Sequence, residues 1–260
     1  MAKAFPESSM VVRAISPNVT TLSVPFLRFN KVKFGGRATI VKLATGNLAV
    51  FSPVNLTAEA RSAVESMGGR VGYIVAPDFE HHMNLGPWKQ EYASATVIGP
   101  EGLYEKRKSQ GNEDVPIDIV YTKENKGSLK LPEELANVFD VEYFDGHVNK
   151  EIVFNYKPER TMIQADLVFN LPAHEQFSKS GVDATSGIWT KLATHFLNIH
   201  GKGQQRFNWY AAPANKPSFA ESVKVVAGWE IDRIIPCHGD VIESGGSDVF
   251  KHIFQWHLKA

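Results

Sequence analysis

The chain has 260 residues, of which 43% are hydrophobic and 22% are charged, and this composition is typical of one globular domain with a large core. Its 28 Lys and Arg balance 28 Asp and Glu, which excludes the net basic charge typical of proteins that bind nucleic acid or an anionic membrane. We therefore expect a small-molecule substrate and neither nucleic acid nor a membrane as partner. The sequence leaves the oligomeric state open, a homodimer included.

The cellular compartment is predicted from the N-terminus and the cysteine content. Residues 1–7 lack the apolar stretch of a signal peptide, and no later run is long enough for a transmembrane helix. Cys237 is the only cysteine, so no disulfide framework is expected. Together these features predict a cytoplasmic protein.

Strands and helices alternate along the first 100 residues. β-branched runs at 38–43 and 47–51, separated by Gly46-Asn47, predict a hairpin. Thr57 is the expected N-cap of a helix that ends at about Met67. Further segments follow in the order strand 70–75, helix from about 86, and strand 95–98. Such alternation predicts an α/β fold.

The rest of the chain contains a second β-rich block and a long helical segment. Residues 107–130 are polar, and we expect a surface connection there. The later elements are expected at 140–144, 151–156, 161–164 and 231–235 for strands, 171–230 for the helical segment, and from Ser247 for the last helix. We expect residues 1–260 to form a single domain.

Several residues that can bind a metal follow the ends of strands. His81 and His82 come after the strand at 70–75, and His147 follows the strand at 140–144. Asp166 and His238 come directly after later strands. Each residue alone is also typical of a turn or a hydrogen-bonded structural position, but strand ends at one sheet edge converge on a rigid scaffold. Imidazoles with a carboxylate suit zinc, with iron or manganese as alternatives.

The order of these segments resembles the metallo-β-lactamase superfamily. Gly146-His147, the strand and Pro-containing turn that lead to Asp166, and Pro236-Cys237-His238-Gly239 resemble its later metal motifs. The resemblance covers roughly residues 15–245. It implies a four-layer αβ/βα sandwich, with residues 171–230 as a helical insert over the site.

The first metal motif of that superfamily is altered in this chain. In the preferred alignment, Pro77 and Phe79 stand where two metal-binding histidines are expected, His81 replaces the aspartate, and His82 keeps the last histidine. An alignment shifted by one residue would use Asp78, Glu80 and His82 instead. The first alignment groups His82, Asp166 and His238 around one metal, which makes one metal more consistent with the sequence than two. Such a pattern is similar to an uncharacterised branch of the superfamily.

Three functions are compatible with these residues. The favoured one is a hydrolase of a small ester, lactone or amide, in which a metal-bound hydroxide attacks the carbonyl and Asp166 acts as ligand, base or both. An iron-dependent oxidoreductase and a non-catalytic binding protein with a decayed site are the alternatives. Arg206, Trp209 and Tyr210, beside the glycine-rich residues 201–203, are the candidates for a substrate pocket.

Overall fold

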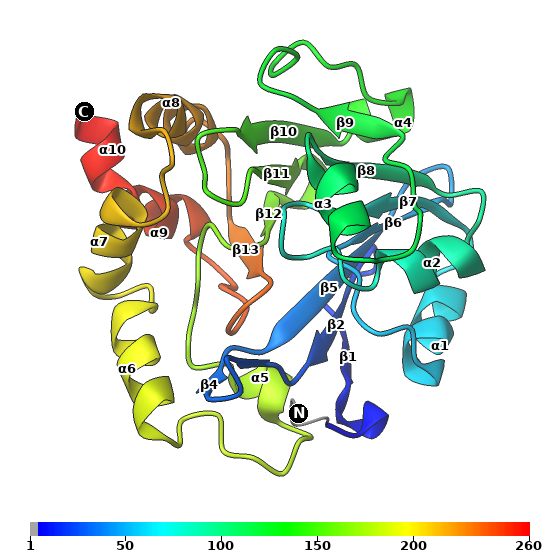
Figure 1. Cartoon of the computed structure of the whole chain (residues 1–260), viewed down its shortest axis with the longest axis horizontal. Coiled ribbons are helices and arrows are strands. Elements are labelled where there is room, and N and C mark those ends of the chain that lie inside the picture. Colours follow the sequence, from blue (N-terminus) through cyan, green and yellow to red (C-terminus); the bar gives the residue numbers. More distant parts are fainter. Residues whose placement is uncertain (1–4) are drawn as a thin grey trace.

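Two β-sheets stacked face to face form the centre of the protein, in a computed structural model that describes residues 5–260 (Figure 1). The larger sheet has the strand order β1-β2-β5-β6-β7-β8-β9, the smaller β10-β11-β12-β13, and β3-β4 is a separate hairpin. The bounds are β1 Val11–Ala14, β2 Val19–Val24, β3 Leu27–Arg28, β4 Val32–Lys33, β5 Gly36–Lys42, β6 Leu48–Phe51, β7 Val71–Val75, β8 Thr96–Pro100, β9 Ile119–Tyr121, β10 Phe139–Phe144, β11 Glu151–Tyr156, β12 Thr161–Gln164 and β13 Arg233–Pro236.

The sheets combine antiparallel hairpins with parallel crossovers. The predicted hairpin is confirmed as the antiparallel pair β5–β6, and β6 to β9 run parallel to one another. The surface connection expected at 107–130 contains one strand. Ile119–Tyr121 forms the edge strand β9 against β8, with Ile98 opposite Ile119. Three residues are too short for a periodic signal, and their pairing with β8 makes them a strand.

Helices cover the outer faces of both sheets and complete the four layers (Figure 1). The predicted four-layer αβ/βα sandwich is therefore confirmed. The helices are η1 Glu7–Ser9, α1 Ala58–Ser66, α2 Leu85–Glu91, α3 Leu103–Ser109, α4 Glu133–Ala136, η2 Lys157–Glu159, α5 His174–Phe177, α6 Ile188–Phe196, α7 Gly203–Tyr210, α8 Lys216–Ala227, α9 Gly246–Ile253 and α10 Gln255–Lys259. Within the part described, no helix is both long and apolar enough to cross a bilayer.

Three apolar layers hold the sandwich together. Between the sheets, the Phe51 ring lies 4.9 Å from that of Phe154. Trp88 of α2 fills the layer outside the larger sheet, and Phe219 of α8 fills the layer outside the smaller one. Burial of each large apolar side chain contributes about 1.5–3 kcal/mol, so these layers fix how the sheets and their connecting loops are placed.

The loops after β7, β12 and β13 carry the candidate ligands His81, Asp166 and His238. Strands β12 and β13 are parallel neighbours, so their following loops leave the smaller sheet at the same edge. The loop after β7 comes from the facing sheet and is tied to β11, because Ile152 N donates to the Pro77 carbonyl over 2.7 Å. The packing of the two sheets thus brings together three segments that are far apart in the sequence.

Candidate metal centre

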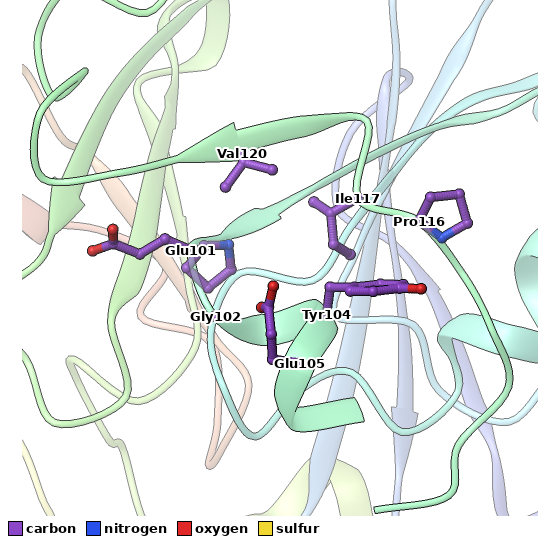
Figure 2. Close-up of a pocket in the computed structure, with 8 residues that line it drawn as sticks. Glu101, Gly102, Tyr104, Glu105, Pro116, Ile117 and Val120 are labelled. Atoms are coloured by element: carbon purple, nitrogen blue, oxygen red, sulfur yellow. The ribbon is translucent and has the colours of Figure 1, made fainter. Parts of the chain in front are cut away.

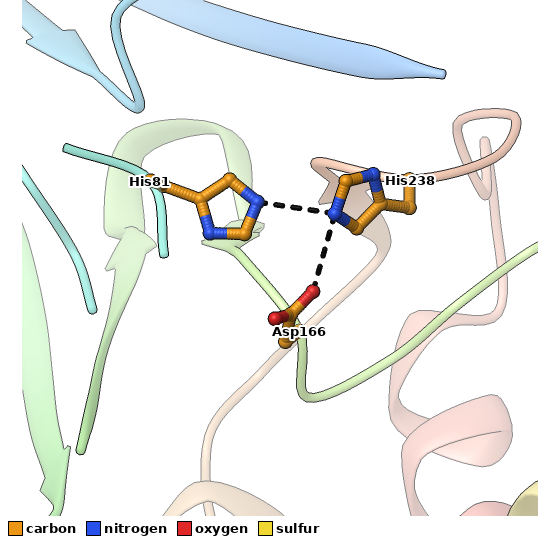
Figure 3. Close-up of side chains that lie close together, drawn as sticks. All are labelled: His81, Asp166 and His238. Carbon is orange, nitrogen blue, oxygen red and sulfur yellow. Dashed lines mark hydrogen bonds and ion pairs between the residues drawn. The ribbon is translucent and has the colours of Figure 1, made fainter. Parts of the chain in front are cut away.

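Three side chains from these loops converge on one point (Figure 3). His81 Nε2 lies 3.1 Å from His238 Nε2, which in turn lies 3.2 Å from Asp166 Oδ1. One ligand atom from each residue lies within 4.8 Å of the others. Two imidazole nitrogens and a carboxylate oxygen at these separations form a set that can hold a divalent cation.

The His238 ring is oriented by a backbone carbonyl and three aromatic rings. Its Nδ1 lies 2.7 Å from the Gly35 carbonyl oxygen, which can only accept, so Nδ1 carries a proton. The Phe169 ring stacks on the imidazole at 5.8 Å, and Phe34 meets it edge-on at 5.2 Å. Phe26 lies at 6.2 Å. In the neutral ring, Nε2 therefore has a lone pair directed at the site.

The backbone around His238 is held equally firmly. Arg37 is fully buried, and its Nη1 donates to the carbonyls of Pro236 and Gly239 over 2.6 and 2.7 Å. Gly239 has φ of +90°, and a Cβ there would overlap the Asn170 carbonyl, so only glycine fits next to the histidine.

Asp78 orients the second histidine. This carboxylate is completely buried, and its two oxygens lie 2.9 and 3.0 Å from His81 Nδ1. Asp78 Oδ1 also accepts hydrogen bonds from the backbone N–H groups of Glu80 and His81. A carboxylate on the far nitrogen fixes the tautomer that presents Nε2 to a metal.

Asp166 is positioned by two polar side chains from β11 and the turn before it. Asn149 Nδ2 donates to Asp166 Oδ2 over 2.8 Å, which leaves Oδ1 directed at His238. The Glu151 carboxylate accepts from the backbone N–H groups of Ala165 and Asp166 over 2.7 and 2.9 Å. The Glu151 carboxylate thus fixes the turn after β12.

The charges of the site are strongly coupled. Burial opposes protonation of His81, but Asp78, followed by Cys237 and Asp166, raises its pKa well above the ordinary histidine value. Burial also opposes ionisation of Asp166, yet His81 and His238 lower the pKa of that carboxyl. Burial, reinforced by Asp78 and Asp166, raises the pKa of Glu151 well above that of an ordinary glutamate. A positive charge is therefore favoured at the point where the three ligands meet.

Two of the three distances between ligand atoms fit a metal such as zinc. Ligand atoms about 2.0–2.1 Å from a tetrahedral ion lie about 3.3 Å from each other. The separations of 3.1 and 3.2 Å are close to that value. Two neutral imidazoles with their lone pairs facing each other would repel, so this arrangement requires a proton or a cation between them.

His82 lies outside the group of three ligand atoms. The sequence grouped His82 with Asp166 and His238, whereas the structure brings His81 to that place. His82 is buried, its carbonyl accepts from Arg107 Nη1 over 2.6 Å, and its Nδ1 lies 3.3 Å from the same guanidinium atom. Burial and the charges of Arg107 and Lys106 lower the pKa of His82, so a neutral imidazole anchors this loop to α3.

His147 lies outside the group of three. It is buried against Phe219, with the rings 5.9 Å apart, and its Nδ1 accepts from the Asn149 backbone N–H. Burial lowers its pKa despite the attraction of Asp166 and Asp78. Because Nδ1 accepts, the proton of the neutral ring is on Nε2, and this tautomer does not present Nε2 as a ligand.

The three predicted pocket residues are on α7, and the structure gives each a different environment. Trp209 packs on His257 of α10, with the ring centroids 4.7 Å apart. Tyr210 and Arg206 are exposed. Phe207, on the same helix, instead contacts Phe169, the ring stacked on His238. Whether Arg206, Trp209 and Tyr210 touch a substrate stays a prediction.

A hollow of about 420 Å³ lies away from these ligands (Figure 2). Its walls come from the ends of β8 and β9 and the start of α3. The lining residues are Pro100, Glu101, Gly102, Tyr104, Glu105, Pro116, Ile117 and Val120. None of the three converging ligands lines it, so size alone does not identify the reactive site.

Sequence reasoning missed the residues that support the ligands. Asp78 was considered only as a ligand in the shifted alignment, and Asn149, Glu151 and Arg37 were not singled out. The carboxylates of Glu80 and Asp240, each within two residues of a ligand histidine, have other partners. Glu80 pairs with Arg28 and Lys106, and Asp240 Oδ1 accepts from the Glu175 backbone N–H. The available signal was the charged residue Glu151 at the start of a strand that continues with three apolar residues.

Comparison with known proteins assigns a family and a fold. Residues 28–178, more than half of the chain, match the domain of unknown function DUF4336. The chain belongs to the DUF4336 family. No curated protein matches the sequence.

This DUF4336 protein is similar along its whole length to solved metallo-β-lactamases. A DIM-1 metallo-β-lactamase exposed to ceftazidime superposes with a TM-score of 0.64 at 13% identity, over 99% of each chain. FIM-1 from Pseudomonas aeruginosa in its mono-zinc form gives 0.59 at 14% identity, over 96% of this chain and 95% of that one. A metallo-β-lactamase from Hirschia baltica gives 0.61 at 11% identity, over 95% and 97%. At these identities the likeness shows the metallo-β-lactamase fold.

Proposed function

We propose that this DUF4336 protein is a hydrolase that uses one metal ion, most simply zinc, held by His81, Asp166 and His238. The carrying observation is the convergence of three ligand atoms whose histidines each have the other ring nitrogen hydrogen-bonded. The His81-His82 segment would then be a divergent form of the first metal motif, in which His81 ligates and Asp78 supports it.

Three protein ligands on a tetrahedral ion leave one position for water, and a bound zinc lowers the pKa of that water towards neutrality. The chain's own residues supply orientation and charge. Asp78 and the Gly35 carbonyl keep both Nε2 atoms directed at the site. Asn149 fixes one oxygen of Asp166 and leaves the other available to a ligand or a proton.

The substrate is proposed as a small ester, lactone or amide. His147 is buried beside the site as a neutral ring whose Nε2 carries the proton, and it can donate to an oxygen that gains negative charge during hydrolysis. The aromatic rings around His238 make one wall of the site apolar, which suits an uncharged acyl group.

Elemental analysis of protein purified without added metal tests the proposal. We expect about one zinc per chain, its loss in His81→Ala, Asp166→Ala and His238→Ala, and its retention in His82→Ala. The adjacent His82 is the matched control, since it is equally close in sequence but bound to Arg107. Bound iron would favour the oxidoreductase alternative. Zinc that survives all three ligand substitutions would refute the assignment.

A further inference from the structure

The exposed apolar side chains of this protein are concentrated on one face beside the metal centre. Eleven large hydrophobic residues are exposed among those described, and six of them lie on α6 or on the β3–β4 hairpin and the residue before it. We call this the hairpin–α6 face, and its apolar members are Phe26, Phe29, Ile188, Trp189, Leu192 and Phe196.

The apolar residues of α6 share one side of the helix. At 100° per residue, Ile188, Leu192, Phe196 and Trp189 fall within an arc of about 100°. Thr190 points the opposite way, is buried, and accepts a hydrogen bond from Lys33 N over 3.2 Å. The helix is therefore anchored to the hairpin through the side that carries Thr190 and Ala193, while its other, apolar side faces solvent.

The hairpin and α6 form one continuous surface. Lys33 Nζ donates to the Ser186 carbonyl over 2.6 Å, and Lys31 Nζ lies 5.9 Å from the Trp189 ring. Figure 1 shows α6 next to β4 at the periphery of the molecule. An apolar helix face with Trp, Phe and bordering lysines is typical of segments that lie in a membrane interface.

Basic side chains outnumber acidic ones around this face. The chain has no Asp or Glu between residues 8 and 58, nor between 184 and 220. The exposed basic residues of these two segments near the face are Arg28, Lys31, Lys191, Lys202 and Arg206. Acidic groups at its edge include Glu80, which pairs with Arg28, and Asp183, which accepts from Thr185. A neutral total charge thus conceals a local basic surface.

We infer that the hairpin–α6 face docks on an anionic lipid bilayer. Aliphatic Ile188 and Leu192 give nucleic acid bases nothing to stack on, whereas they insert readily among acyl chains. A symmetric dimer through this face would oppose Lys31 and Lys191 of both copies without an acidic residue to pair them. Anionic headgroups supply that missing negative charge. The expectation of no membrane partner rested on the charge of the whole chain, whereas docking would depend on the local charge of this face.

Docking would orient the metal centre towards the lipid. Phe26 and Phe34, at the two ends of the hairpin, both contact the His238 ring. The mouth of the site would then face the headgroup region. That consequence rests on the proposed function, whereas the docking itself needs no metal.

Cosedimentation with vesicles tests the inference. The full chain is mixed with vesicles of phosphatidylcholine alone, or with phosphatidylglycerol added, and the bound fraction is measured. We expect binding only to the vesicles that contain phosphatidylglycerol. Because each lysine near an anionic surface contributes about a fivefold gain, Lys31→Glu with Lys191→Glu should weaken binding by about thirtyfold or more.

The apolar half of the face is tested by Ile188→Ser combined with Leu192→Ser, which should also abolish binding. Matched controls are Val225→Ser on α8 and Lys108→Glu on α3, both exposed and outside this face, and these should bind normally. Circular dichroism and zinc content, measured on every variant, separate loss of docking from loss of fold or metal. The inference is overturned if no vesicle binds, if the variants all bind equally, or if the Ile188→Ser/Leu192→Ser pair abolishes a dimer that forms without lipid.

Discussion

Replacing Asp78 by asparagine is the sharpest test of how the metal centre is held. The carboxylate accepts from His81 Nδ1 with both oxygens while it also accepts two backbone N–H groups. Asparagine keeps the shape but offers only one accepting oxygen, so its amide N–H₂ would face the imidazole N–H. The ring is then driven to the other tautomer, with a proton on Nε2 where the metal should bind.

The expected magnitude follows from that change of tautomer. Loss of a partner behind a ligating histidine typically weakens metal binding by about 10- to 100-fold, which corresponds to about 1.4–2.7 kcal/mol. We therefore expect the zinc dissociation constant of Asp78→Asn to rise by this factor, measured by titration against a chromophoric chelator. Activity at saturating zinc should recover in part.

Glu80→Gln is the matched control for this experiment. Glu80 is two residues away, but its carboxylate pairs with Arg28 and Lys106 near the surface rather than with a histidine. Its substitution should leave zinc affinity unchanged. If Asp78→Asn, folded by circular dichroism, binds zinc as tightly as the unmodified protein, then Asp78 does not orient a ligand and the reasoning fails.

Three further predictions concern pH and stability. The carboxylates around His81 raise its pKa. Protonation of His81 therefore stabilises the metal-free fold fully below the unfolded histidine pKa near 6.5, and this stabilisation is lost as pH rises through the folded pKa. Zinc binding should then release a proton and tighten as pH rises, which calorimetry in buffers of different ionisation enthalpy would measure. Burial opposes ionisation of Glu175, but Arg37, Ser23 and Arg13 lower its pKa, so its stabilising effect is present above the unfolded pKa and declines as pH falls through the folded pKa. Arg37→Met leaves Glu175 paired with Arg13, but it removes the fully buried partner and orphans the carbonyls of Pro236 and Gly239. It should cost about 3–5 kcal/mol in urea unfolding, and an unchanged midpoint would contradict this. Trp88→Phe should lower the free energy of unfolding by about 2–3 kcal/mol. The substitution opens a cavity and leaves the Val54 carbonyl, which now accepts from Trp88 Nε1 over 2.7 Å, without this donor. Thermal melts would measure the loss.

The fold could be predicted because its signals are local and repeated. The β5–β6 hairpin, the helix capped by Thr57, and the strands that lead to Asp166 and His238 each have a pattern in a few residues. The Thr57 hydroxyl indeed accepts from Ala60 N over 3.2 Å. Strand β9 could not be predicted in this way, because its three residues form a strand only by pairing with β8.

The choice between His81 and His82 could not be made from the sequence. The two residues are adjacent in a loop, where no helical or strand periodicity says which side chain points inward. Contacts from distant segments decide it, because Asp78 binds one imidazole and Arg107 holds the backbone and ring of the other. Support for His238 from Arg37 and Gly35 likewise joins residues about two hundred positions apart.

The origin of the three ligands has a consequence for folding. His81 lies on a loop that follows a strand of the larger sheet, while Asp166 and His238 lie on loops that follow strands of the smaller one. Neither sheet alone therefore supplies all three ligands. An ion bound here would cross-link the two sheets, and its binding free energy would oppose their separation. Metal binding would then require that the two sheets are correctly packed. A chelator should weaken the interface between the sheets before it disrupts either sheet.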